Sequence, residues 1–212
     1  MITIIDYAAG NLTSVARAVR YLGHPCRITP YAEEIAASER VIFPGVGSAG
    51  QAMEHLQKTG IDQAIRAYCA TGRPFLGICL GTQIILDQSE EHDTPCLGII
   101  KGQVKRFPDP LISSDSTLQK VPHMGWNNIE IKKAHPVLKG ILNEHEFYFV
   151  HSYYPAPESV EVILGKTIHG MEFTSILGVN NIIAAQFHLE KSGRPGLMLL
   201  ENFCKWNGEY AE

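Results

Sequence analysis

Residues 75–83, FLGICLGTQ, place one cysteine between two glycines directly after an apolar run. The spacing of Gly77, Cys79 and Gly81 is that of a nucleophile elbow, a tight turn from a strand into a helix. The glycines remove side chains that would collide with neighbouring elements, so the sulfur would be exposed at the carboxyl end of a sheet. The turn also opens a helix, whose N-terminal partial charge favours thiolate over thiol. Taken alone, the pentapeptide is equally typical of a buried structural cysteine.

A base for that thiol is offered by QFHLE at 186–190. If this segment ends a strand, His188 and Glu190 share one face, about 6.5–7 Å apart along the chain. Glu190 can then hold one ring nitrogen of His188 and leave the other free to take the thiol proton. An incidental histidine beside a solvated glutamate is the commoner interpretation of such a pair. A zinc-deaminase H-x-E is excluded because the P-C-x-x-C that it requires is absent.

Donors for an oxyanion come from the elbow and from a glycine loop, IFPGVGS at 42–48. The N–H of Leu80, the residue after the thiol, can point at a developing negative charge. If the two strands are neighbours, an N–H from Val46 or Gly47 completes the oxyanion hole. By itself the loop is typical of an ordinary strand-to-helix turn. The elbow, the H-x-E pair and the loop together indicate a Cys-His-Glu nucleophilic enzyme.

The first half of the chain alternates between strand and helix patterns. Predicted strands cover 2–7, 26–29, 40–45 and 75–78, and predicted helices cover 12–22, two segments between 48 and 72 divided near Gly60, and 80–86. Asn11 is expected to cap the first helix, which Gly23 closes. This rhythm predicts an α/β fold with an open, mostly parallel sheet and helices on both faces, of flavodoxin- or Rossmann-like type.

The second half, after about residue 95, is β-like. Its predicted runs are 96–107, 126–132, 146–154, 160–168 and 181–190, and we expect an antiparallel β extension on the same sheet. A last helix is predicted from Arg194, with Leu199, Leu200, Phe203 and Trp206 packed inward. Segment 109–117 is the best candidate for a mobile loop. No repeat, low-complexity tract or convincing linker interrupts the chain, so we expect a single domain over 1–212.

Composition excludes several classes of protein. Hydrophobic residues make up 45% of the chain and charged ones 19%, with a formal net charge of -4. No Lys/Arg run indicates nucleic-acid binding, and no apolar run approaches the roughly 20 residues that span a bilayer. The N-terminus, MITIIDYAAG, is unlike a signal peptide. Five scattered cysteines without a CxxC pair argue against a disulfide framework or a zinc ribbon and favour a cytoplasmic location.

Assembled, these segments resemble the class I, triad-type glutamine amidotransferases, and among them the glutaminase subunits of imidazole glycerol phosphate synthase. The resemblance runs nearly the whole length and rests on DYAAGNL at 6–12, PGVGS at 44–48, GICLGTQ at 77–83, KVPHMGWN at 120–127, FYFVHSYY at 147–154 and QFHLEKSG at 186–193. The elbow and the H-x-E pair are typical of the superfamily. KVPHMGWN and FVHSYY are the more specific segments and point to the histidine-pathway branch.

The resemblance implies the class I glutamine amidotransferase fold and a reaction without metal or cofactor. Cys79 would attack the side-chain amide of L-glutamine, with His188 as base and then acid and Glu190 orienting the ring. Ammonia leaves, and water hydrolyses the γ-glutamyl thioester to glutamate. The groups implied to seat the substrate are Gln83 and the backbone of Ser152 and Tyr153.

A partner is also implied, a cyclase with a (β/α)₈ barrel that forms a heterodimer with this chain. The residues implied to face it are Asn11, Met124, Gly125, Tyr148 and Lys191. Chemistry supports the expectation, because ammonia released into neutral water would be protonated and lost as a nucleophile, so an enclosed route to an acceptor site is needed. We further expect the oxyanion hole to mature only when the loaded partner is docked.

Three positions depart from the family pattern: Leu189 stands where the family usually has proline, Thr82 where methionine is common, and Ala8 where glycine is usual. Three alternatives stay open at this point. One is another Cys-His hydrolase, such as a peptidase or a γ-glutamyl hydrolase. The second is an amidotransferase subunit that feeds another synthase, and the third is a non-catalytic subunit retained for assembly.

Overall fold

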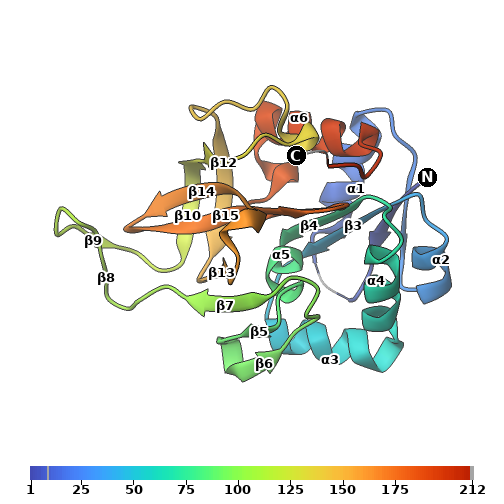
Figure 1. The fold of residues 1–212 in the computed structure, drawn as a ribbon, viewed down its shortest axis with the longest axis horizontal. Helices are drawn as coiled ribbons and strands as arrows, with labels where there is room; N and C mark the ends of the chain where they lie inside the picture. The colour runs from blue at the N-terminus through green and yellow to red at the C-terminus, as the bar shows by residue number, and fades with distance from the viewer. Residues whose placement is uncertain (9, 211–212) are drawn as a thin grey trace.

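The computed structural model describes residues 1–8 and 10–210, and its centre is an eight-stranded sheet (Figure 1). The strand order is β11-β14-β15-β16-β4-β3-β1-β2. The first half of the chain supplies β1 (Ile2–Ile5), β2 (Cys26–Thr29), β3 (Arg40–Gly45) and β4 (Phe75–Cys79). These strands pair in parallel with one another, and β4 also pairs in parallel with β16 (Ile182–Ala185). The predicted open α/β sheet is confirmed.

Helices connect these strands and cover both faces of the sheet. They are α1 (Leu12–Tyr21), α2 (Ala32–Ala36), α3 (Ala49–Thr59), α4 (Ile61–Cys69), α5 (Leu80–Ile84) and α6 (Gly193–Lys205). The break between α3 and α4 falls at Gly60, as predicted, where the backbone has φ 71°. The short helix α2 was not predicted from the sequence.

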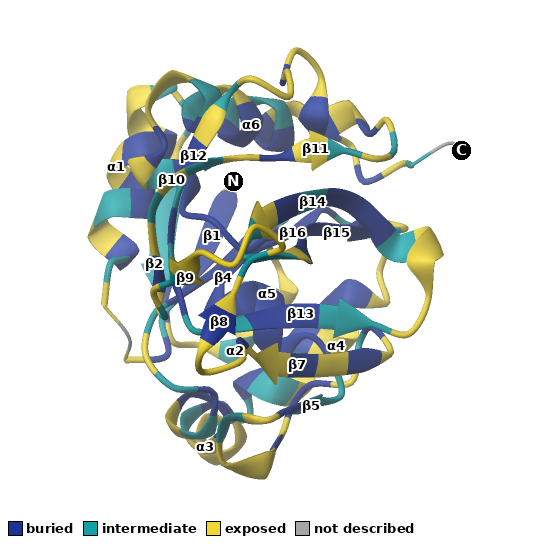
Figure 2. Cartoon of the chain, turned by 90° about the vertical axis from the view of Figure 1, so that its left-hand side faces the viewer, coloured by how far each residue is buried: buried dark blue, intermediate teal, exposed yellow. Residues whose placement is uncertain are grey.

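Alternation along the strands sends successive side chains into two separate cores. Ile42 of β3 packs in one core with α1 and α6, while its neighbours Val41 and Phe43 pack in the other with α2, α3, α4 and α5. Figure 2 shows the inner strands of the sheet mostly in dark blue, buried between layers of helices and loops, whereas the edge strand β11 is largely exposed. Leu199, Leu200, Phe203 and Trp206 are all buried, so the predicted inner face of the last helix is confirmed.

The second half of the chain extends the sheet with antiparallel strands. They are β11 (Glu130–Ile131), β14 (Ile163–His169) and β15 (Met171–Val179), which joins β14 to β16. Strand β15 was not predicted. Short 3₁₀ helices also occur in the described chain: η1 (Glu91–Asp93) before this part of the fold, and η2 (Pro136–Leu138), η3 (Val160–Val162) and η4 (Leu189–Lys191) within it.

The predicted antiparallel extension on the same sheet is thus confirmed, but the predicted runs at 96–107 and 146–154 lie in separate small sheets. The strands of these small sheets are β10 (His123–Asn128) with β12 (Glu146–His151), β13 (Tyr153–Pro157) with β7 (Gly102–Arg106), β5 (Gln88–Ser89) and β6 (Thr94–Pro95), and β8 (Leu111–Ile112) with β9 (Leu118–Gln119). Aromatic packing is the reason. The ring of Phe147 on β12 lies 4.3 Å from that of Phe187, and Phe149 lies 6.0 Å from Phe173 of β15. The two-stranded β10–β12 sheet is therefore stacked on its neighbours through side chains.

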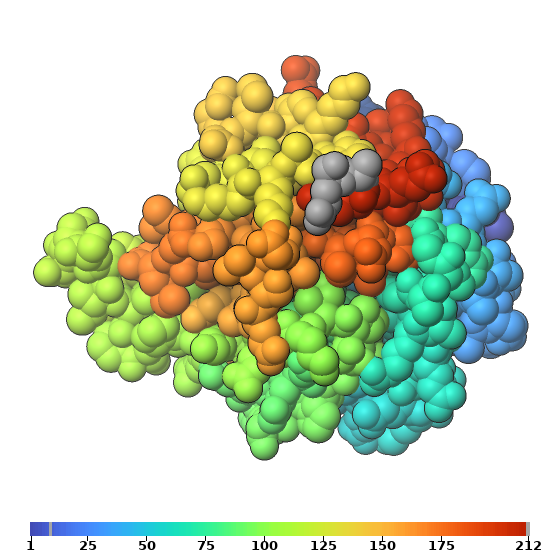
Figure 3. All heavy atoms as spheres, viewed as in Figure 1, coloured from blue at the N-terminus to red at the C-terminus, as the bar shows by residue number. Residues whose placement is uncertain are grey.

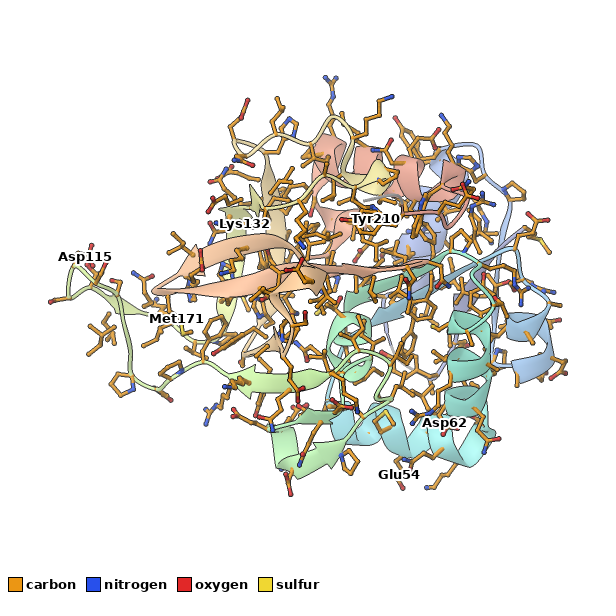
Figure 4. All side chains as sticks on the ribbon, in the orientation of Figure 1. Glu54, Asp62, Asp115, Lys132, Met171 and Tyr210 are labelled. Atoms are coloured by element: carbon orange, nitrogen blue, oxygen red, sulfur yellow. The ribbon has the colours of Figure 1, made fainter. Side chains whose placement is uncertain are left out.

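Segment 109–117, expected to be a mobile loop, contributes to the β8–β9 hairpin, which stands away from the body of the molecule (Figure 1, Figure 3). Asp115 lies near its outer end (Figure 4), and its carboxylate accepts hydrogen bonds from the Ser113 hydroxyl and the Thr117 backbone N–H. Its mobility stays a prediction. Among the described residues, no helix has the length and apolar character needed to cross a membrane.

His135 offers a test of the packing at the C-terminal helix. Its Nδ1 accepts a hydrogen bond from the backbone N–H of Val137, and its ring lies 4.9 Å from that of Trp206. Burial lowers the pKa of His135 to about 4. An unfolded histidine titrates near 6.5, so between these two values the unfolded chain binds a proton that the native chain does not. The free energy of unfolding should then decrease as pH falls.

We predict that His135→Asn reduces this pH dependence. Asparagine keeps an acceptor for Val137 but does not titrate, so the slope between pH 6.5 and 4 should drop by up to about 1.4 kcal/mol per pH unit. Urea unfolding at several pH values measures the slope. Equal slopes for the two proteins would contradict the assignment of His135 as a neutral buried group.

Candidate active site

Cys79 occupies the turn between β4 and α5, as the elbow pattern predicts. Its backbone has φ 54° and ψ -105°, a region that residues with a side chain rarely adopt, and its exposed fraction is 6%. A Cβ at Gly81 would lie 2.0 Å from the carbonyl oxygen of Phe43, and one at Gly77 would lie 3.0 Å from the carbonyl oxygen of Gly81. Close backbone packing therefore requires both glycines.

The segment that carries the predicted base is not a strand, and here the sequence interpretation is wrong. Strand β16 ends at Ala185, and His188 makes one isolated bridge to Tyr148, in which the His188 N–H donates to the Tyr148 carbonyl at 2.9 Å. Glu190 lies in η4. A turn at 188–192 is closed by the Ser192 hydroxyl, which donates to the His188 carbonyl at 2.5 Å. Helix α6 begins directly after this turn.

The pairing of His188 with Glu190 is nevertheless present. Nδ1 of the imidazole lies 2.8 Å from Oε1 of the carboxylate, and both side chains are almost fully buried. The same oxygen accepts a second hydrogen bond, from the side-chain amide of Asn11. A carboxylate that receives Nδ1–H leaves Nε2 as the basic nitrogen of the neutral ring.

The electrostatics of His188 favour its charged form. Burial disfavours the imidazolium, but interactions with the Cys79 sulfur and with the Glu190 carboxylate outweigh burial and raise the pKa of His188. Its Nε2 is buried and makes no hydrogen bond of ordinary length and angle to any described residue. The imidazole can therefore accept a proton from the thiol and hold it.

A cavity of about 360 Å³ opens in front of the sulfur. This volume lies at the lower end of the range for small-molecule sites. Seven residues predicted from the sequence line it: Val46, Gly47, Cys79, Leu80, Gln83, Ser152 and Tyr153. His151 and Glu91 also line the cavity and were not predicted, although His151 stands in the FVHSYY segment that carries the family resemblance. His188 and Glu190 do not line the cavity.

The glycine loop lies beside the elbow because Gly45 of β3 pairs with Cys79 of β4. Gly47 has φ 101°, which favours glycine there. Tyr7, not predicted as a site residue, packs under this loop, and a Cβ on Gly45 would lie 2.4 Å from its hydroxyl. Burial, with a smaller contribution from Cys79, raises the pKa of Tyr7. The direction of the Val46 and Gly47 N–H groups stays a prediction.

Four of the residues predicted to face a partner lie close together. Met124 and Gly125 are on β10, Tyr148 is on the paired strand β12, and the Lys191 ammonium lies 5.8 Å from the Tyr148 ring. Met124 has an exposed fraction of 63%. Trp126, missed from the sequence, is 53% exposed, and its ring lies 5.9 Å from that of Tyr148.

Asn11 differs from those four residues. It occupies the N-cap position of α1 in the left-handed region, but its side chain makes no capping hydrogen bond, so the predicted cap is wrong. The side chain instead reaches Glu190, 179 residues away in the chain. No group of three or more His, Cys, Asp or Glu side chains that could hold a metal ion occurs among residues 1–8 and 10–210.

Comparison with known proteins agrees with this geometry. Residues 3–206 match the family model described as glutamine amidotransferase class-I. The imidazole glycerol phosphate synthase subunit HisH of Nitratidesulfovibrio vulgaris strain Hildenborough is 51% identical over 212 residues, which cover 100% of this chain and 99% of that protein. The HisH subunit of Maridesulfovibrio salexigens is 48% identical, with 100% of both chains covered. The chain belongs to the HisH family of class-I glutamine amidotransferases.

Solved structures agree on the fold. A crystal structure of a glutamine amidotransferase has a TM-score of 0.71 at 17% identity and covers 96% of this chain and 100% of its own. The structure of PurLQS from Thermotoga maritima has a TM-score of 0.73 at 14% identity, with 96% of both chains covered. At such low identity the likeness concerns the arrangement of helices and strands.

The departures from the family pattern are accommodated by packing. The Leu189 side chain is buried in the core beside α6. Its backbone lies against the same helix, because a Cβ added to Gly196 would lie 2.1 Å from the carbonyl oxygen of Leu189. The hydroxyl of Thr82 donates to the Ala185 carbonyl at 2.6 Å. The orientation of His188 is held by its hydrogen bonds to Tyr148 and Glu190, which do not need a proline at 189.

We predict that Gly81→Ala destabilises the fold strongly. The added methyl group would overlap the Phe43 carbonyl, which cannot move without displacing β3, so the free energy of unfolding should fall by about 3 kcal/mol or more. Gly50→Ala is the matched control. Its Cβ meets only the Thr94 hydroxyl at 3.4 Å, and alanine is favoured over glycine within helix α3 by about 1 kcal/mol. Urea unfolding measures the free energy of unfolding of both variants. Equal values for Gly81→Ala and Gly50→Ala would contradict the prediction.

Proposed function

We propose that this chain is the glutaminase subunit of an imidazole glycerol phosphate synthase and supplies ammonia for histidine biosynthesis, with residues 1–212 forming one amidotransferase domain. The observation that carries the proposal is the placement of Cys79 on a strained turn, at the wall of a cavity and beside a buried histidine–glutamate pair. This arrangement suits a thiol that must lose its proton and attack a carbonyl carbon.

The reaction would begin with proton transfer from the Cys79 thiol to Nε2 of His188. The thiolate attacks the side-chain amide carbon of L-glutamine, and the oxygen becomes an oxyanion that the Leu80 N–H, with Val46 or Gly47, stabilises. His188 then gives its proton to the amide nitrogen, the C–N bond breaks, and ammonia leaves. Water, deprotonated by His188, attacks the thioester carbon, and the collapse releases glutamate and restores the thiol.

The substrate seat would be formed by Gln83 and by the backbone of Ser152 and Tyr153. Support comes from their shared position at the wall of the cavity that Cys79 also lines. The Gln83 side chain donates to the Tyr153 carbonyl at 2.9 Å, which joins α5, the helix after the nucleophile, to the start of β13. This hydrogen bond keeps the Gln83 side chain and the Tyr153 backbone next to each other.

The relatives are named as subunits of imidazole glycerol phosphate synthase. For this chain the proposed partner is a cyclase of (β/α)₈ type, bound as a heterodimer over Met124, Gly125, Tyr148 and Lys191. Two exposed apolar side chains, Met124 and Trp126, favour this surface as the contact. We place the complex in the cytoplasm, since the described cysteines are all unpaired thiols.

We predict that Cys79→Ala abolishes hydrolysis of glutamine, with a loss of at least about 1000-fold. Synthesis by the reconstituted complex should continue when an ammonium salt replaces glutamine, because only the source of ammonia is removed. Cys69→Ala is the matched control, since Cys69 is buried at the C-terminal end of α4 and does not line the cavity. Glutamate release and product formation are measured separately. Retained glutamine hydrolysis in Cys79→Ala would show that another group is the nucleophile.

We predict weak glutaminase activity for the chain alone and at least about tenfold stimulation by a histidine-pathway cyclase with its nucleotide ligand bound. The physical reason is that the loop at 44–48 supplies part of the oxyanion hole and would reach its active geometry only in the complex. Met124→Glu should reduce the stimulation, whereas Met198→Glu, on the exposed side of α6, should not. Equal rates with and without the cyclase would refute the coupling.

A further inference from the structure

The Tyr153 carbonyl oxygen, at the cavity wall, accepts two hydrogen bonds from two other residues that line the cavity. The Gln83 side-chain amide donates at 2.9 Å, and Nδ1 of His151 lies 2.8 Å away. A carbonyl oxygen can only accept, and it has two lone pairs. Both neighbours must therefore present N–H groups, which decides the amide orientation of Gln83 and the tautomer of His151.

On the side of the nucleophile, the side-chain amides of Gln83 and Gln186 connect the Tyr153 carbonyl to the Cys79 sulfur. Gln83 uses its second amide hydrogen toward Oε1 of Gln186, at 3.1 Å. Since that oxygen accepts, the amide nitrogen of Gln186 is turned the other way, and Nε2 lies 3.7 Å from Sγ of Cys79. Gln186 has an exposed fraction of 0%. The sulfur therefore receives an N–H donor whose direction is set by the Tyr153 carbonyl.

On the other side of the Tyr153 carbonyl, the tautomers of two histidines, His151 and His123, are fixed in the same way. His151 donates from Nδ1, so its Nε2 accepts from Nδ1 of His123 at 3.0 Å, and Nε2 of His123 accepts from the Asn127 amide at 3.2 Å. Burial, with a smaller contribution from neighbouring histidines, lowers the pKa of His123 and of His151 to about 3. Both rings are neutral near pH 7, so the chain of donors and acceptors keeps its direction there.

We propose that Gln186 is a positioning residue that holds an N–H against the sulfur of Cys79 and stabilises its thiolate. The inference rests on the proposed function, in which Cys79 is the nucleophile. A hydrogen bond to a charged acceptor is stronger than one to a neutral acceptor, so this contact favours the thiolate over the thiol. Gln186 keeps its proton throughout, while His188 takes and returns the thiol proton, so the two residues have distinct roles.

The test compares Gln186→Leu, which has no hydrogen-bonding group, with Gln186→Glu, which presents an acceptor in place of the donor. Alkylation of Cys79 by iodoacetamide is followed from pH 5 to 10, and peptide mass spectrometry separates this cysteine from the other four. The pH of half-maximal alkylation should move up by about one unit in Gln186→Leu, and further in Gln186→Glu once the buried carboxyl ionises and its negative charge faces the sulfur.

The control is Thr82→Val. It removes a buried hydrogen bond to Ala185, one residue before Gln186, without removing a donor to the sulfur. Stability should fall in Thr82→Val, but its alkylation profile should keep the wild-type midpoint. The other titratable groups about the sulfur are His188, Tyr7 and, around the cavity, His151 and Glu91, and all variants leave them unchanged.

An unchanged midpoint in a variant that gives the wild-type circular dichroism spectrum would overturn the proposal. If Gln186→Leu does not fold, Gln186→Glu provides the measurement, because its carboxylate still accepts from Gln83. Alkylation does not need glutamine as substrate. A wild-type chain that fails to hydrolyse glutamine with its cyclase would therefore refute the proposed function, while the midpoints would still decide the role of Gln186.

Discussion

The left-handed backbone at Cys79 is the constraint on which the rest of the site depends. A residue with a side chain in such a conformation costs about 1–3 kcal/mol, and surrounding packing must hold it there. That packing consists of β3 on one side, where the Phe43 carbonyl touches Gly81, and the start of α5 on the other. The same contacts place the Leu80 N–H, the sulfur and the cavity in a constant relation to one another.

The base reaches this turn by a different means. His188 lies beyond the end of β16, and the strand that holds its backbone is β12, through the Tyr148 carbonyl. Glu190 and Ser192 then fix the imidazole and the direction of the chain. The catalytic pair therefore depends on the two-stranded β10–β12 sheet as much as on the central sheet.

Strands β10 and β12 therefore connect the exposed surface around Met124 to the active-site cavity. The exposed face of the β10–β12 sheet carries Met124 and Trp126, while its inner face carries His123, which joins His151 and the cavity wall. A shift of this sheet would move the strand that holds the base and His151, whose ring bonds the Tyr153 carbonyl. This link is the physical basis of the coupling proposed above between glutamine hydrolysis and a bound synthase.

The sequence by itself determined the order of the parallel strands and of every first-half helix except α2, and the residue types of the nucleophile, base and carboxylate, because glycine spacing and apolar periodicity act locally. Tertiary structure alone decided the division of the later strands into separate sheets, the place of Glu190 in a 3₁₀ helix, and the contacts of Asn11 and Gln186. Those features arise between segments far apart in the chain. Their geometry depends on which surfaces pack together, and no local pattern records that choice.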